Sequence, residues 1–223
     1  MKLLAADTAL GACSVAVLDA EKILAHRFVP MERGHAEALA PMVDDVMCEA
    51  RLVFPALERL AVTTGPGTFT GQRVGLAFMR GLRIALHCPL IGITTLEVMA
   101  HQAMAETGLA LAATLHDARR GEVYLAIHDA QTERLSARLA TLGEAITAIA
   151  EFSAGEQIAL AGTAALPAAE ELSKRGMDVR LCSVRQPDAL WVAKRALVAA
   201  ETKTAPKPLY LRPSDARLPA RPA

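Results

Sequence analysis

Apolar residues occur in short blocks along the chain, and polar or glycine-rich turns separate these blocks. Residues 2–8, 12–19 and 22–29 are three such blocks, and their lengths predict three strands in an antiparallel meander. Beyond residue 30 the apolar spacing changes to a helical period, and strands and helices then alternate. This order predicts a mixed sheet with helices on its faces, as in an RNase H-like lobe.

The stretch Leu60–His87 organises this first lobe as a strand, a glycine-containing loop and a long helix. The glycines allow a sharp turn into the helix, and Thr70 is the expected N-cap. The loop departs from a Walker phosphate-binding loop, because Gln72 and Arg73 stand where that motif requires lysine and Ser or Thr. We therefore interpret it as a tight connector between strand and helix.

Two helices carry more apolar surface than contact with one sheet requires, those predicted over residues 35–51 and 71–87. In the second helix Val74, Phe78 and Leu82 are expected to face the sheet together with Ala85. Pro41 predicts a kink or a late start in the first helix. The surplus fits either full burial in one domain or a helix-on-helix seam with another subunit. The expected seam residues are Leu39, Met42, Val46, Val74, Phe78, Met79, Gly81, Leu82 and Ala85.

A second series of strands and helices follows and repeats the plan of the first. We therefore expect an α/β protein with an N-terminal lobe at residues 1–106, a C-terminal lobe at 107–203 and a proline-rich tail at 204–223. The tail is expected to be extended or loosely ordered. The pattern leaves open on which lobe the last helix packs.

Composition narrows the possible functions. Lys plus Arg and Asp plus Glu both count 24, so the chain lacks the strongly basic balance of a nucleic-acid-binding domain. No apolar run approaches the ~20 residues of a membrane span, and the N-terminal run is too short for a signal peptide, so a cytoplasmic protein is expected. Four separated cysteines predict buried reduced thiols, and six histidines without ligand spacing predict no metal or cofactor site.

Few polar residues suggest chemistry. Asp7 and Thr8 end the first strand, where they could contact nucleotide phosphates through a metal ion and a hydroxyl, or simply satisfy the amides of a turn. Asp117, Arg119 and Arg120 form a charged turn that fits a position between the lobes or a solvated hairpin. The spacing predicts no Ser/His/Asp or Cys/His set, so no catalytic residue is assigned.

Four segments resemble one known family: LLAADTALGACSVAVLD, TTGPGTFTGQRVGLAFMRGL, PLIGITTLEVMA and HDARRGEVYLAIHD. They are similar to TsaB, also called YeaZ, over residues 2 to about 130, and the two-lobed plan resembles the actin, hexokinase and Hsp70-like (ASKHA) superfamily. The departures are modest: Ala36 follows the histidine that opens the first helix where the family often has serine, and the loop reads GPGTFTGQR instead of GPGSFTGLR.

The resemblance implies a scaffold role. In that family TsaB is the bacterial partner of TsaD in making threonylcarbamoyladenosine on tRNA, and TsaD transfers the threonylcarbamoyl group. TsaD-like sequences carry an N-H-x-E-G-H metal motif after the strand that matches PLIGI. Here Thr95 and Met99 stand at the two histidine positions, and neither replaces an imidazole ligand. The expected partners are a TsaD homologue, the TsaE ATPase in a larger complex, a second copy when alone, and tRNA only through the complex, with no membrane.

Other hypotheses stay open. The chain could be an ASKHA-type ATP-dependent kinase that uses Asp7 and Thr8, or a TsaD-like metallopeptidase acting alone. Direct tRNA binding through Arg212, Arg217 and Arg221 in the tail is a further possibility.

Overall fold

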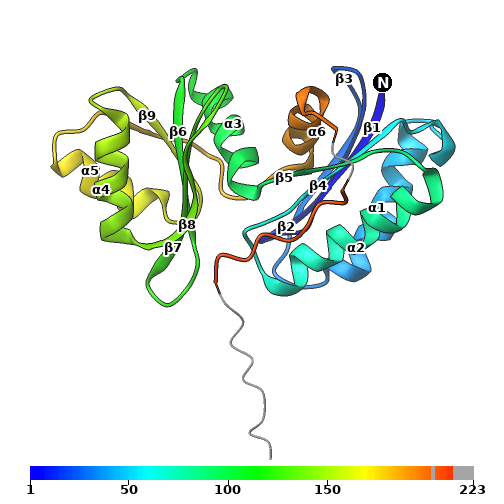
Figure 1. Cartoon of the computed structure of the whole chain (residues 1–223), viewed down its shortest axis with the longest axis horizontal. Coiled ribbons are helices and arrows are strands. Elements are labelled where there is room, and N and C mark those ends of the chain that lie inside the picture. The colour runs from blue at the N-terminus through cyan, green and yellow to red at the C-terminus, as the bar shows by residue number, and fades with distance from the viewer. Residues whose placement is uncertain (202–203, 213–223) are drawn as a thin grey trace, which may run out of the picture.

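The computed structural model describes residues 1–201 and 204–212 as two lobes, each built on a five-stranded sheet (Figure 1). The first sheet has the order β3-β2-β1-β4-β5 and the second β10-β9-β6-β7-β8, so the expected repetition of one plan is confirmed. In each, the first three strands in sequence are antiparallel and the later two run parallel to the first of them. The strands are β1 (Lys2–Asp7), β2 (Ala12–Asp19), β3 (Lys22–Pro30), β4 (Arg59–Thr63), β5 (Leu90–Ile93), β6 (Leu111–Asp117), β7 (Glu122–Asp129), β8 (Glu133–Thr141), β9 (Ile158–Ala161) and β10 (Val179–Leu181).

Helices cover both faces of each sheet. The helices are α1 (His35–Glu49), the 3-10 turn η1 (Phe54–Ala56), α2 (Phe69–Leu86), α3 (Thr95–Thr107), α4 (Leu142–Ser153), α5 (Ala165–Lys174) and α6 (Ala189–Val198). On the outer faces, α1 and α2 pack on the first sheet and α4 and α5 on the second (Figure 1). Burial on both faces explains why the central strands read as continuous apolar runs.

Two helices are exchanged between the lobes. Helix α6 packs its buried apolar residues against β1, β2 and β4 of the first sheet, and α3 packs on β6, β7 and β9 of the second. The two helices also contact each other between the sheets. Each thus crosses the boundary suggested at residues 106 and 107 and covers the sheet of the other lobe. This packing answers the question of the last helix, which the apolar pattern alone left open.

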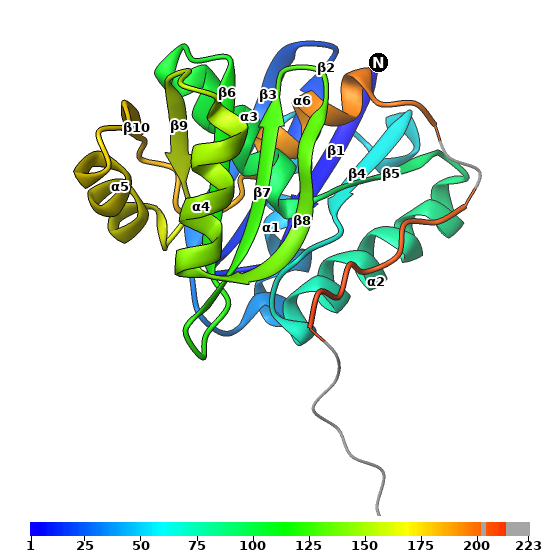
Figure 2. The same ribbon diagram turned by 60° about the vertical axis from the view of Figure 1, so that its left-hand side comes forward.

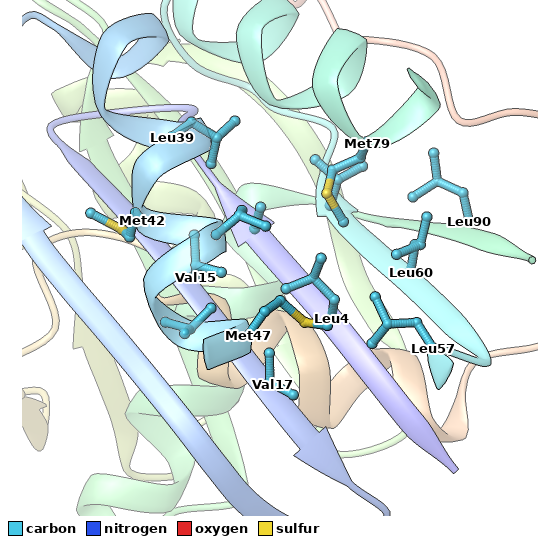
Figure 3. Packing of buried hydrophobic residues seen from close by; sticks show 14 of the residues in the cluster. Leu4, Val15, Val17, Leu39, Met42, Met47, Leu57, Leu60, Met79 and Leu90 are labelled. Carbon is cyan, nitrogen blue, oxygen red and sulfur yellow. The ribbon is translucent and has the colours of Figure 1, made fainter. Parts of the chain in front are cut away.

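The core between α1, α2 and the first sheet corrects part of the expected seam (Figure 3). Leu39, Val46 and Met79 are fully buried in this core, and Met42 is only 9% exposed, so they are not available to another subunit. The remaining expected seam residues are partly buried against the same core or exposed. Three of them are partly buried, namely Val74, Phe78 and Leu82. Two are exposed, namely Gly81 and Ala85.

The side of α2 that faces the sheet also differs from the expectation. Its buried residues include Gly75, Leu76 and Met79, whereas Ala85 is exposed. Gly75 accounts for this orientation, since a Cβ built there would lie 2.7 Å from Thr8 Oγ1 at the end of β1, and only a residue without a side chain lets the helix approach so closely. Val74, Phe78 and Leu82 are partly buried against the core that α1, α2 and the first sheet share.

Three smaller expectations need correction. The N-cap of α2 is Thr68, whose Oγ1 accepts a hydrogen bond from the Gly71 amide at 3.0 Å, and Thr70 lies inside the first turn. Helix α1 begins at His35 and continues through Pro41, so there is no late start. Cys48 is exposed on the outward side of the last turn of α1, while the other three cysteines are buried as free thiols.

Helix α4 begins with a capping box that allows a quantitative prediction. Thr141 Oγ1 accepts a hydrogen bond from the Glu144 amide, and the Glu144 carboxylate accepts one from the Thr141 amide. Thr141→Ala should lower the free energy of unfolding by about 1 kcal/mol, because an amide of the first turn loses its acceptor. Thr147→Ala in the same helix is the control, since that hydroxyl only bonds a carbonyl inside the helix. Equal effects in urea titrations would contradict the prediction.

Among residues 1–201 and 204–212, no helix has the length and apolar character needed to span a membrane.

Candidate functional site

The candidate nucleotide residues Asp7 and Thr8 lie where β1 ends against the start of α2. Thr8 Oγ1 donates a hydrogen bond to the Gly71 carbonyl at 2.7 Å and accepts one from the Gly75 amide at 3.0 Å. The Thr8 side chain is fully enclosed, with 1% of its surface exposed. Its hydroxyl is therefore used to hold α2 on the first sheet, and a phosphate would reach it only after α2 moved.

Two glycines bring the backbones of the two loops together at the same place. A Cβ at Gly67 would lie 2.3 Å from the Ala9 carbonyl oxygen, and one at Gly71 would lie 2.2 Å from the Thr8 carbonyl oxygen. The Thr68 amide also donates a hydrogen bond to the Ala9 carbonyl at 2.8 Å. The loop GPGTFTG therefore packs directly on the β1–β2 turn, which confirms its interpretation as a tight connector.

Asp7 is completely buried and only half satisfied. Its Oδ1 accepts hydrogen bonds from the Thr63 hydroxyl at 2.5 Å and from the Ala9 amide at 3.2 Å. Within the described part of the chain Oδ2 has no hydrogen-bond partner. Burial raises the pKa of this carboxyl to about 7, against the lowering effect of its two hydrogen bonds, and the nearby charge of Asp188 adds to the rise. A carboxyl of this kind is a proton-binding group near neutral pH.

Residues just before α6 join this region, and the sequence reasoning missed them. The Gly11 amide donates a hydrogen bond to Gln186 Oε1 at 2.9 Å. Asp188 caps α6 by accepting from the Leu190 amide at 2.8 Å, and the same oxygen lies 2.7 Å from His26 Nε2. An aspartate between Pro187 and a helical apolar pattern is a typical N-cap signal, but nothing local indicates that it lies beside the first strand.

At the positions where the family resemblance expects metal-binding histidines, the side chains are enclosed. Thr95 and Met99 in α3 are each 0% exposed, and Met99 packs in the core between α3 and the second sheet. Thr94, just ahead, caps α3 by accepting a hydrogen bond from the Glu97 amide at 3.2 Å. The described residues include no group of three His, Cys, Asp or Glu side chains arranged to hold a metal ion.

The charged turn of the second lobe forms the β6–β7 hairpin. Asp117 Oδ1 accepts a hydrogen bond from the Arg119 amide at 2.8 Å, and its own amide donates to Thr163 Oγ1 at 2.9 Å. Arg119 and Arg120 have φ angles of 64° and 58°, so both residues adopt the left-handed backbone conformation. The Arg119 carbonyl and the Glu122 carboxylate accept hydrogen bonds from Arg212 of the tail. The turn is thus held by the tail rather than fully solvated.

The arrangement of the two lobes defines the fold class of the protein. Two lobes on one sheet plan, meeting across α3 and α6, form the two-lobed fold that the ASKHA resemblance predicts. Component A of the Acidaminococcus fermentans (R)-2-hydroxyglutaryl-CoA dehydratase shares this fold, with a TM-score of 0.55 over 88% of this chain and 98% of that one, at 11% identity. The chain belongs to the family described as TsaD, tRNA N6-adenosine threonylcarbamoyltransferase, whose model matches residues 22–206, and within it to the TsaB/YeaZ group.

Individual relatives support this membership. An Escherichia coli protein, tRNA threonylcarbamoyladenosine biosynthesis protein TsaB, is 39% identical over 126 residues, which are 56% of this chain and 54% of that protein. An uncharacterised Mycobacterium bovis protein is 33% identical over 96% of this chain and 93% of its own length. A Pseudomonas aeruginosa crystal structure, described as an uncharacterised protein with similarity to peptidase YeaZ, has a TM-score of 0.82 and 31% identity over 95% of this chain and 99% of that one.

The similarity to the Escherichia coli protein thus spans about half of that protein's length, whereas the uncharacterised relatives match almost throughout.

Proposed function

We propose that this chain is a non-catalytic subunit that pairs with a TsaD homologue in the complex that forms threonylcarbamoyladenosine on tRNA. The observation that carries the proposal is the burial of Thr95 and Met99 at the positions where TsaD-like sequences carry their two metal-binding histidines. Neither side chain is a good ligand, and both belong to the interior packing of α3. The chain would then supply a surface, while its partner supplies the chemistry.

The closed end of β1 supports the same proposal. Asp7 is enclosed, so a nucleotide could not reach its unpaired Oδ2, and the Thr8 hydroxyl already makes two hydrogen bonds to α2. The enclosure also argues against the alternative of an ATP-dependent kinase, which would have to open this region. A metallopeptidase acting alone would need donors that the residues around Thr95 do not provide.

The surface that we propose for the partner is the outer face of α2. Ala77, Gly81, Ile84 and Ala85 are all exposed, and Ile84 exposes 73% of its surface. At about 100° per residue these four lie on one side of the helix, next to Arg73 and Arg80, which contact the tail. Small side chains at 77, 81 and 85 would let a helix of a TsaD homologue approach closely. In the absence of that partner we propose that a second copy of this chain takes its place.

Ala85→Arg tests this surface. Ala85 is exposed, so a large charged side chain there should leave the fold intact and weaken association with the TsaD homologue at least tenfold in a pulldown after co-expression. Phe78 and Leu82 are poorer test positions, because they are partly buried in the chain's own core. Ala105→Arg, at an exposed position on α3, is the matched control. Equal retention of the partner by both variants would overturn the proposed surface.

The non-catalytic role has a separate test. Calorimetry with ATP and magnesium, and elemental analysis of the purified chain, should show neither micromolar nucleotide binding nor a stoichiometric metal. Micromolar nucleotide binding or a stoichiometric metal would overturn the proposal.

We further propose that TsaE and tRNA meet this chain only inside the larger complex. Arg212 is engaged with the β6–β7 hairpin, and Arg217 and Arg221 lie outside the described residues.

A further inference from the structure

The C-terminal residues 204–212 follow a defined path along α2 and end at the second lobe (Figure 2). They run from the end of β5 toward the start of α2, opposite in direction to the helix, and carry Pro206 and Pro208. Prolines restrict φ and favour an extended backbone, so this segment loses little conformational freedom when it binds. We call residues 204–212 the strap.

The first lobe holds the strap at several points. Next to β5, Pro206 lies so close to Gly92 that a Cβ on that glycine would be 2.5 Å from the proline ring. Arg80 of α2 donates a hydrogen bond to the Pro206 carbonyl. Further along, the Leu209 amide donates to the Thr64 carbonyl at 2.7 Å, directly after β4.

The strongest feature of this contact is an aromatic and cationic stack at the first turn of α2. Tyr210 stacks on Phe69 with ring centroids 5.9 Å apart and an interplanar angle of 26°. The Arg73 guanidinium lies 3.5 Å from the Phe69 ring centroid, and its Nε donates a hydrogen bond to the Tyr210 hydroxyl at 2.7 Å. A cation over an aromatic ring is attracted by the negative face of the ring, so Arg73 stabilises the stack.

The last described residue of the strap reaches the other lobe. Arg212 pairs with Glu122 of the β6–β7 hairpin, and the two side chains are 22% and 34% exposed. Arg212 also donates to the Arg119 carbonyl at 3.4 Å, a long hydrogen bond. Nothing in the strap's own sequence is acidic, so the carboxylate that pairs with Arg212 comes from the second lobe.

We propose that the strap is a clasp that couples the start of α2 in the first lobe to the β6–β7 hairpin in the second. The lobes already touch through α3 and α6, and the strap adds a second connection on the opposite side of the first sheet, beside the outer face of α2. When the clasp is closed, the two lobes keep one spacing at this edge. When either end is released, both ends become mobile. This inference concerns the chain by itself and does not depend on a partner.

The test reads one lobe after a change in the other. Glu122→Ala removes the carboxylate that pairs with Arg212 in the second lobe, leaves only the long hydrogen bond to the Arg119 carbonyl, and does not alter α2. We expect the amide hydrogen exchange of Leu209, which bonds to Thr64 in the first lobe, to speed up about tenfold, with a smaller increase in the first turn of α2. In the reverse direction, Tyr210→Ala should speed exchange of the Glu122 amide, which bonds to the Arg119 carbonyl at 3.1 Å.

Matched controls keep the test decisive. Arg134→Ala breaks a comparable ion pair to Asp129 at 3.3 Å that stays within the second lobe, so exchange at Leu209 should not change. Tyr210→Phe keeps the stack on Phe69 and loses only the hydroxyl, so its effect should be smaller than that of Tyr210→Ala. Exchange that rises only in the lobe that carries the substitution would overturn the clasp, and so would exchange that does not rise in either variant.

Discussion

Gly71→Ala should destabilise the folded chain by at least about 3 kcal/mol. The added Cβ would lie 2.2 Å from the Thr8 carbonyl oxygen and 2.6 Å from the Thr68 hydroxyl, and the first of these neighbours is backbone that cannot rotate away. Relief would require α2 to leave the β1–β2 turn, which would also break the two hydrogen bonds of Thr8. Chemical denaturation followed by circular dichroism measures the loss.

Gly81→Ala makes the same chemical change in the same helix and is the matched control. A Cβ at Gly81 meets no atom within 4 Å, and the residue is exposed in the helix interior. Since alanine favours a helix over glycine by roughly 0.8–1 kcal/mol, this variant should be more stable than the parent chain. If the two substitutions change stability in the same direction, the inference that α2 lies in close contact with the β1–β2 turn is wrong.

Asp7→Asn should make the chain more stable at pH 8 and should change the shape of its pH profile. The pKa of Asp7 is about 7 in the folded chain and close to its ordinary value of 3.8 in the unfolded one. A raised pKa means that the protonated carboxyl favours folding below pH 4 and that this contribution disappears as the pH rises through 7. The stability of Asp7→Asn relative to the parent should therefore increase between pH 4 and pH 8, by on the order of 2–4 kcal/mol.

The buried histidines act at the acid end of the same profile. Burial lowers the pKa of His101 and of His116 to about 4, so their contribution is present above pH 6.5 and is lost as the pH falls through 4. Both chains share this effect, and it cancels in the difference between them. Thr147→Ala, at an exposed position on α4, changes no titratable group and should run parallel to the parent curve. A constant difference between Asp7→Asn and the parent across this range would contradict the raised pKa.

The local pattern predicted the elements well because their causes are local. Apolar runs of strand length, helical spacing and glycine turns placed the described strands and helices in their observed order. Thr70 failed as the N-cap because Thr68, two residues earlier, satisfies the same rule and lies closer to the turn. The family resemblance placed the loop, the missing histidines and the hairpin from residues that are contiguous in the chain.

Interface residues were harder to predict, since surplus apolar surface on a helix has two destinations. Leu39, Val46 and Met79 looked available for a partner, but α1 and α2 pack on each other and bury them. The outer face of α2 became recognisable only once Gly75 had shown which side of the helix approaches Thr8 at the end of β1. The spacing of apolar residues along a helix indicates how wide its buried stripe is. It does not indicate which element or subunit packs on that stripe.

By itself the sequence determined the α/β class, the repeated lobe plan and the membership suggested by its motifs, because each of these depends on residue type and spacing along the chain. The family resemblance added the expectation that Thr95 and Met99 stand where relatives carry two metal ligands. Tertiary structure alone decided the exchange of α3 and α6 between the lobes, the enclosure of Asp7 and the path of the strap to Glu122. Those features depend on contacts between residues far apart in the sequence, and no local periodicity encodes such distances.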